Sequence, residues 1–150
     1  MPDITYQKEP WRLVEDEIIP LAKEHFVECD PTHGMAKFEF DRDGMLVLES
    51  NNMLHVTTAR DGTRLVGYIV NLVMPRHLMF NKPFASHLGW YVLPGYRRKM
   101  VGMRLLEQAE RLLQGVVELT LGMHTHTTDA SKMFLRLGWE KSETNYMKWI

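Results

Sequence analysis

The sequence is short of the features that mark secreted, membrane-spanning or repetitive proteins. Cys29 is the single cysteine among 150 residues, which excludes an internal disulfide and a cysteine zinc site. The longest apolar stretch, residues 65–74, contains Gly67 and Asn71 and falls far short of the ~20 residues that span a bilayer. No repeat, linker or low-complexity run is present, and the polar residues 1–10 do not resemble a signal peptide. We therefore predict a cytoplasmic protein that does not enter a membrane.

An excess of charge of one sign is also lacking. Eighteen basic and nineteen acidic residues leave a formal net charge of −1, so the chain lacks the overall positive field typical of nucleic-acid-binding proteins. Hydrophobic residues make up 45% of the sequence and charged residues 25%, which are ordinary values for a folded globular protein. The length is typical of one compact domain. We predict a single domain over residues 1–150, with no nucleic acid among its partners.

Apolar spacing and turn residues predict alternating helices and strands. Pro20 should kink or split the first helix, and Asp61-Gly62 should form a hairpin turn. Asp129 is the expected N-cap of the last helix, and Gly138 should end it. The predicted helices cover residues 11–28, 41–52, 101–113 and 129–137, and the predicted strands cover residues 54–60, 64–74, 87–93, 116–123, 139–141 and 145–149. This order predicts an α/β fold, a mixed sheet with helices on its faces and one right-handed crossover.

The most informative segment lies between residues 91 and 106. A predicted strand ends there, three consecutive cations (Arg97, Arg98 and Lys99) follow, and a helix begins at about Val101. Unpaired N–H groups at a helix N-terminus bind phosphate well, and Gly102 would let a ligand approach the backbone. The segment therefore predicts a phosphate site, with a solvated basic turn as the alternative. A nucleic-acid patch is a third reading, which the scarcity of interleaved aromatic residues disfavours.

The same segment resembles the signature of the GCN5-related N-acetyltransferases (GNAT). In that family a strand ending in Val-x-Pro-x-Tyr-Arg leads into a Gln/Arg-x-x-Gly-x-Gly/Ala loop; Arg97 matches the first loop position and Gly102 the last. Met100 stands where the family usually has glycine. Residues 65–68 are similar to the family's Leu-Val-Gly strand, and residues 130–139 are similar to its Ala-x-x-Leu-Tyr-x-x-x-Gly-Phe motif. The outline is also similar to that of small acetyltransferases encoded by tailed phages.

The resemblance implies a splayed, mostly antiparallel central sheet flanked by helices. It also implies an enzyme that moves an acetyl group directly from acetyl-CoA to a primary amine of a small molecule or protein. The thioester would lie in the gap between the strands predicted at residues 87–93 and 116–123. The alternative is a catalytically weak or inactive acyl-CoA-binding relative that acts through a protein partner, which Met100 and Phe134 favour. Acetyl-CoA and the amine are the expected partners, with a homodimer as an option.

The resemblance further implies where acetyl-CoA binds. Backbone N–H groups of residues 97–103 would hold the pyrophosphate, and the pantetheine would pair with the strand near Tyr91 and Val92. Met100 would crowd this loop if its conformation demanded a positive φ. Thr127 stands where relatives often have an asparagine that contacts CoA. The implied cofactor-binding residues are Tyr91, Val92, Arg97, Arg98, Lys99, Met100, Val101, Gly102, Met103, Thr127 and Phe134.

Acyl transfer needs a base for the amine and is helped by an acid for the thiolate. The family often places a tyrosine acid where this chain has Phe134, which cannot donate a proton. That leaves Ser131, Tyr146, a water molecule or no acid. We predict His87 as the base, because an imidazole titrates near neutral pH and His87 lies on the strand that leads to the loop. A surface histidine is the competing interpretation.

Two further pairs are candidates for substrate binding. His124 and His126 follow a strand at spacing i, i+2 and should point to one face, for substrate binding or proton relay. No third ligand follows at a telling spacing, so we predict no metal site. His25 and Glu28 share one face of the first helix, which in this fold commonly forms a wall of the acceptor pocket. The alternatives are polar residues at a strand end and an exposed pair on a kinked helix.

Overall fold

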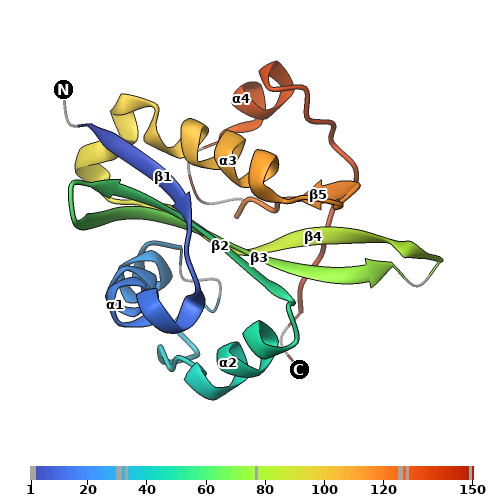
Figure 1. The fold of residues 1–150 in the computed structure, drawn as a ribbon, viewed down its shortest axis with the longest axis horizontal. Helices are drawn as coiled ribbons and strands as arrows, with labels where there is room; N and C mark the ends of the chain where they lie inside the picture. Colours follow the sequence, from blue (N-terminus) through green and yellow to red (C-terminus); the bar gives the residue numbers. More distant parts are fainter. Residues whose placement is uncertain are drawn as a thin grey trace.

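The protein folds as one five-stranded sheet with helices on both faces (Figure 1). The computed structural model describes residues 3–29, 32, 34–76, 78–124, 127, 129–148 and 150. Its elements are β1 (Ile4–Lys8), α1 (Trp11–Cys29), α2 (Arg42–Ser50), β2 (Leu54–Asp61), β3 (Arg64–Arg76), β4 (Met79–Val92), the 3₁₀ helix η1 (Pro94–Lys99), α3 (Val101–Leu112), β5 (Glu118–Thr120) and α4 (Ser131–Arg136). The strands lie side by side in chain order; all neighbours are antiparallel except β4 and β5. This confirms the predicted mixed, mostly antiparallel sheet.

The helices form two layers, each with its own part of the core. Helices α1 and α2 lie on one face of the sheet, and α3 and α4 lie on the other (Figure 1). On the first face Trp11, Val14 and Ile18 of α1 are fully buried. On the second face the apolar side of α3 packs in the same way, with Leu105 and Leu106 at 0% exposure. Apolar burial on both faces explains why β3 reads as an almost continuous apolar run.

Helix α1 is continuous through Pro20, so the predicted split does not occur. Proline removes the hydrogen bond to the carbonyl of Asp16. Both Pro20 and Asp16 are exposed, so water can satisfy that carbonyl. The buried stripe of α1 then packs on the sheet and stabilises the helix as one unit.

Several strand limits differ from the prediction. Strand β1 was not predicted; its short, largely polar sequence forms an edge strand because β2 supplies the hydrogen-bonding partner. Strand β4 begins at Met79, ahead of the predicted residue 87, since it pairs with β3 as a long hairpin. The predicted strand 116–123 shrinks to β5, because only Glu118–Thr120 pair with β4.

The C-terminal prediction was wrong in the described residues. Residues 139–148 contain no strand, and most of their side chains are exposed; they do not pair with the outer edge of β5, which is the last strand of the sheet. Trp149 lies outside the described residues. The N-cap of α4 is Ala130 rather than Asp129, although the Asp129 carboxylate accepts a hydrogen bond from the Ser131 amide at 2.9 Å. In the part of the chain that the structure describes, no helix is both long and apolar enough to cross a membrane.

Candidate active site

A cleft opens where β4 and β5 separate. The two strands pair only through Phe84–Ser86 and Glu118–Thr120, and β4 then continues to Val92 without a strand on that side. The resulting strand cleft has a volume of about 510 Å³ and is bounded by residues 87–92 of β4, by residues 121–124 after β5 and by the start of α3. The backbone edge of β4 therefore faces an open space, where it can form hydrogen bonds with an extended, amide-containing ligand.

A β-bulge sets the orientation of the β4 side chains along this cleft. Val70 of β3 pairs with Gly89 and the next residue, Asn71, pairs with His87, so Leu88 is the extra residue. Beyond the bulge, Tyr91 packs on the α1 face of the sheet, whereas Trp90 and Val92 pack on the α3 face. One strand thus presents different side chains to the two layers.

The turn between η1 and α3 adopts the left-handed conformation at Met100. Its backbone angles are φ 60° and ψ 12°, and no side chain caps the N-terminus of α3. The condition under which Met100 would crowd the loop, a positive φ, is therefore present in the structure. A residue with a Cβ atom loses roughly 1–2 kcal/mol in this conformation. The uncapped first-turn amides of α3 are free of side-chain acceptors and suit an anionic ligand.

Arg97 is held by protein groups instead of extending freely into the cleft. Its guanidinium forms a bidentate ion pair with Glu28, both distances being 2.6 Å, and its Nε donates to the Val92 carbonyl at 2.8 Å. The guanidinium also lies 5.2 Å from the ring centroid of Tyr91. The hydrogen bond from Arg97 lowers the pKa of Glu28. Arg97 thus ties the η1 turn to α1 and to the end of β4.

The other two cations of the turn differ from Arg97 and from each other. Lys99 lies over the ring of Tyr96, 5.3 Å from its centroid, and is not among the residues that line the cleft. Arg98 does line the cleft, and its side chain makes no hydrogen bond or ion pair with any described residue. Arg98 is therefore the cation of this turn that an anion in the cleft would meet.

Among the described residues, His25, His87 and His124 line the strand cleft; the predicted partner His126 lies outside the described residues. His87 accepts a hydrogen bond at Nδ1 from the Gly122 amide, 3.2 Å away. Burial lowers the pKa of His87 to about 4, with the nearby His25 and His124 acting in the same direction. His87 is therefore a neutral imidazole that bridges the two separating strands.

His25 reaches the same region from α1. Its Nδ1 lies 3.1 Å from the hydroxyl of Tyr68, and its ring stacks on Tyr91 with centroids 5.1 Å apart. Burial lowers the pKa of His25, although the neighbouring Glu28 acts in the opposite direction. At neutral pH this imidazole is uncharged and able to accept a proton.

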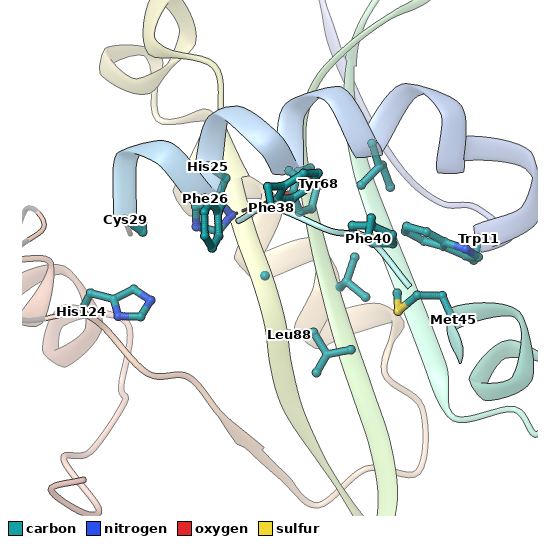
Figure 2. Close-up of a pocket in the computed structure, with 14 residues that line it drawn as sticks. Trp11, His25, Phe26, Cys29, Phe38, Phe40, Met45, Tyr68, Leu88 and His124 are labelled. Atoms are coloured by element: carbon teal, nitrogen blue, oxygen red, sulfur yellow. Dashed lines mark hydrogen bonds between the residues drawn. The ribbon is translucent and has the colours of Figure 1, made fainter. Parts of the chain in front are cut away.

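A second cavity, the aromatic pocket, is not predicted by the sequence; it lies between α1, the segment before α2 and strands β3 and β4 (Figure 2). Its volume is about 290 Å³. Trp11 stacks on Phe40 with centroids 5.4 Å apart, and Phe26 packs against Phe38 at 5.7 Å. The available signal was the pair of phenylalanines at 38 and 40 in a segment predicted as loop. The lining residues are Trp11, Ile18, Ala22, His25, Phe26, Cys29, Phe38, Phe40, Met45, Tyr68, Val70, Leu88, Gly89 and His124.

Comparison with known protein families identifies the family and the activity of the chain. Residues 15–139 match the acetyltransferase (GNAT) family. The chain belongs to this family. It is an N-acetyltransferase that uses acetyl-CoA as cosubstrate and an amine as acceptor, as the sequence predicts. No curated protein sequence matches the chain.

Solved acetyltransferase structures share the fold at low sequence identity. The aminoglycoside acetyltransferase meta-AAC0020, from an uncultured soil metagenomic sample and in complex with sisomicin, has a TM-score of 0.73 and 16% identity over 98% of this chain and 96% of its own. Ribosomal-protein-alanine N-acetyltransferase from Brucella melitensis biovar Abortus 2308 has a TM-score of 0.72 and 16% identity over 98% and 99% of the two chains. The aminoglycoside N-acetyltransferase AAC(6')-Iy in complex with CoA has a TM-score of 0.70 and 15% identity over 97% and 98%. At these identities the likeness establishes the fold.

Most of the other predicted cofactor-binding residues line the strand cleft, but one belongs to the core. Tyr91, Val92, Gly102, Met103 and Thr127 all line the strand cleft, as does Met100. The side chain of Val101, in contrast, is 1% exposed and belongs to the core, so only its backbone is available to a ligand. Both the amide and the hydroxyl of Thr127 donate to the His124 carbonyl, at 3.2 Å and 2.9 Å.

Ser131 and Tyr146, the two candidate proton donors, and Phe134, which replaces the family's tyrosine, lie in different surroundings. Phe134 is 9% exposed and packs between Trp90 and Trp139, with ring centroids 5.9 Å and 5.4 Å away. Ser131 lines a cavity that adjoins the strand cleft and shares His87 with it. Tyr146 is 94% exposed and lines neither cavity. The structure thus brings Ser131, but not Tyr146, near His87.

Proposed function

We propose that acetyl-CoA binds along the strand cleft, with its pyrophosphate at the turn of residues 97–103 and its acetyl end beside the β4 bulge. The supporting observation is that an open strand edge, residues 87–92, leads directly to an uncapped helix N-terminus. The first suits the amides of pantetheine and the second suits phosphate. The bound cosubstrate supplies an acetyl group activated as a thioester. Arg98 adds the positive charge, and Arg97 positions the turn.

The residues of the cleft fit such a ligand. A Cβ atom at Gly102 would lie 3.4 Å from the Trp90 ring, so glycine at this position keeps the wall of the cleft open.

We assign proton removal from the amine to His25 in preference to the sequence-predicted His87. The Nδ1 atom of His87 accepts the Gly122 amide proton, and its low pKa makes it a weak base. His25 lines both the strand cleft and the aromatic pocket, so an amine entering from the pocket meets its ring. His87 then acts as a positioning residue that holds the separated strands.

The leaving thiolate needs little assistance. A thiolate is stable enough to depart unprotonated, and of the candidates Ser131 lies on the side of the cleft where a proton could be returned. Backbone N–H groups on the open edge of β4 are the donors we propose for the developing negative charge on the carbonyl oxygen. Phe134 serves as an apolar wall.

The compartment, the partners and the oligomeric state of the enzyme are also proposals. We propose a cytoplasmic enzyme that acts on amines and not on nucleic acid, which the net charge of −1 and the pairing of Arg97 with Glu28 support. A homodimer stays a prediction, and sedimentation velocity tests it by measuring the oligomeric state.

The substitution Gly102→Glu tests the assignment of the cleft. The new carboxylate would project toward Trp90 and Val92 and should lower the affinity for CoA by roughly 100-fold or more, through charge repulsion and lost space. Gly95→Glu is the matched control, because it adds the same charge to the same turn and a Cβ atom there meets no atom within 4 Å. Calorimetry that found equal affinities for the two variants would refute the assignment.

The weak or inactive relative remains the second candidate because Met100 occupies a left-handed position. Thiol release from acetyl-CoA over a panel of amines separates the two functions. Tight CoA binding without thiol release on any amine would favour the binding protein.

A further inference from the structure

The aromatic pocket and the strand cleft meet beside Gly89, which has no side chain to separate them. Both cavities are lined by His25, Cys29, Leu88, Gly89 and His124. A Cβ atom at Gly89 would lie 3.3 Å from the Tyr68 ring and 3.9 Å from Cε1 of His25. Figure 2 shows His25 on α1 and His124 across the gap from it. A molecule seated in the aromatic pocket can therefore extend past Gly89 into the cleft.

The pocket wall has the chemistry of an aromatic recognition site. The rings of Trp11 and Phe40 are stacked with an interplanar angle of 11°. Phe38 leans against Phe40, with centroids 6.1 Å apart, and continues the aromatic surface toward Phe26. Stacked and tilted ring pairs of this kind extend readily to another aromatic ring.

The described part of this wall carries no counter-charge for an ammonium group. Among the described residues that line the aromatic pocket there is no Asp, Glu, Lys or Arg. An ammonium group buried without a partner carries a large desolvation penalty. The pocket can thus accept the apolar body of an acceptor but not a second ammonium group. A polycation such as an aminoglycoside or a polyamine does not match it.

The volume limits the size of the acceptor. At about 290 Å³ the pocket is nearly twice the ~150 Å³ cavity that holds benzene in an engineered protein. This leaves room for one ring system and a short chain, roughly ten to twelve non-hydrogen atoms. We infer that the acceptor is a primary arylalkyl monoamine, with its ring beside Phe26 and Phe38 and its amine beside His25. The inference rests on the proposed placement of acetyl-CoA in the strand cleft.

Bonds, electron pairs and protons all balance when the acetyl group passes from acetyl-CoA to the amine with His25 as the base. The lone pair of the neutral amine forms a bond to the acetyl carbon, and the carbon–sulfur bond breaks with its electron pair passing to sulfur. One amine proton passes to His25 and is finally returned to the thiolate. The products are an N-acetyl arylalkylamine and CoA, with no redox partner required.

Competition between acceptors tests the inference. Phenethylamine and spermidine are both primary amines, so kcat/KM with acetyl-CoA compares the apolar and the polycationic body directly. We expect phenethylamine to be preferred by roughly 100-fold or more, because its ring is buried and no second charge is desolvated. Calorimetry in the presence of CoA measures phenethylamine binding without turnover.

Two variants connect the preference to the pocket. Ala22→Phe should fill the cavity and weaken phenethylamine binding by roughly 10-fold or more while leaving CoA affinity unchanged. Ala36→Phe, at an exposed position that lines neither cavity, is the matched control and should change neither. Phe38→Asp, on a half-buried segment, adds a counter-charge and should shift the preference toward spermidine by roughly 10-fold.

The outcomes separate this inference from the proposed function. Loss of CoA binding in Gly102→Glu together with a preference for phenethylamine supports both. CoA binding at the cleft with a preference for spermidine, or for a peptide with an aromatic N-terminal residue, overturns the acceptor class alone. Unchanged phenethylamine binding in Ala22→Phe also overturns it. Equal CoA affinity in Gly102→Glu and Gly95→Glu overturns the proposed function, whatever the acceptor.

Discussion

Replacing Met100 by glycine should stabilise the protein. The left-handed conformation at φ 60° costs a residue with a Cβ atom roughly 1–2 kcal/mol, and glycine escapes this cost. Glycine also gains freedom in the unfolded chain, which offsets about 0.4–1 kcal/mol. The side chain of Met100 is 52% exposed, so its removal loses little packing. The expected net gain in the free energy of unfolding is about 0.5–1 kcal/mol.

Urea unfolding of three variants isolates the backbone contribution. Met100→Ala keeps the Cβ atom and should resemble the parent, whereas Met100→Gly should have a higher midpoint with an unchanged m value. The midpoint of thermal unfolding should rise by about 2–3 °C for a chain of this length. Asn52→Gly is the matched control: its φ of 57° is also positive, but asparagine tolerates this region, so the gain should be smaller.

One result would refute the reasoning. If Met100→Gly and Met100→Ala were equally stable, the turn would not hold residue 100 in the left-handed region. The glycine variant also tests the second candidate function. If the methionine weakens the cofactor turn, Met100→Gly should bind CoA several-fold more tightly by calorimetry.

The remaining predictions concern pH and charge. The pKa of His87 is about 4 in the folded protein and about 6.5 in the unfolded chain, so protons bind the unfolded chain more tightly. A fall from pH 7 to pH 5 should therefore lower the free energy of unfolding by roughly 2 kcal/mol, and His87→Gln should not show this loss. Parallel pH profiles of urea unfolding for the two proteins would argue against this. His25→Gln should lower kcat/KM at pH 7.5 by roughly 100-fold or more and abolish the acid limb below pH 6.5, with CoA affinity intact; an unaltered profile would remove His25 as the base. Arg98→Ala should weaken CoA binding and reduce its salt dependence without changing the melting temperature. Arg97→Ala should also lower the melting temperature, because it removes the ion pair with Glu28; identical melting temperatures for the two variants would contradict this difference.

Local signals predicted the parts of the fold that depend on local structure. The apolar stripes of α1 and α3 and the turn at Gly62 were recognisable, because each is determined by neighbouring residues. Strand β1 and the first half of β4 were missed, since their stability comes from pairing with remote strands. The predicted C-terminal strands failed for a related reason: a local apolar pattern does not show whether the segment pairs with a remote strand, and residues 139–148 do not pair with the edge strand β5.

The candidate site was predictable to the same extent. The turn of residues 97–102 was identified from its sequence, but that Arg97 is paired with Glu28 follows only from the contact between η1 and α1. Helical spacing placed His25 and Glu28 on one face without revealing their partners. The aromatic pocket could not be predicted, because it joins the start of α1 to a segment without regular structure.

Strand β4 separates two kinds of evolutionary change. Gly89 lines the aromatic pocket, where the acceptor is proposed to bind, whereas residues 90–92 line the strand cleft and not that pocket. Neighbouring positions of one strand can therefore mutate under different selective pressures. A lineage could acquire a new acceptor through position 89 and the facing residues of α1 while residues 90–92 preserve acetyl-CoA binding. A directed-evolution library restricted to positions 22 and 89 would use this division.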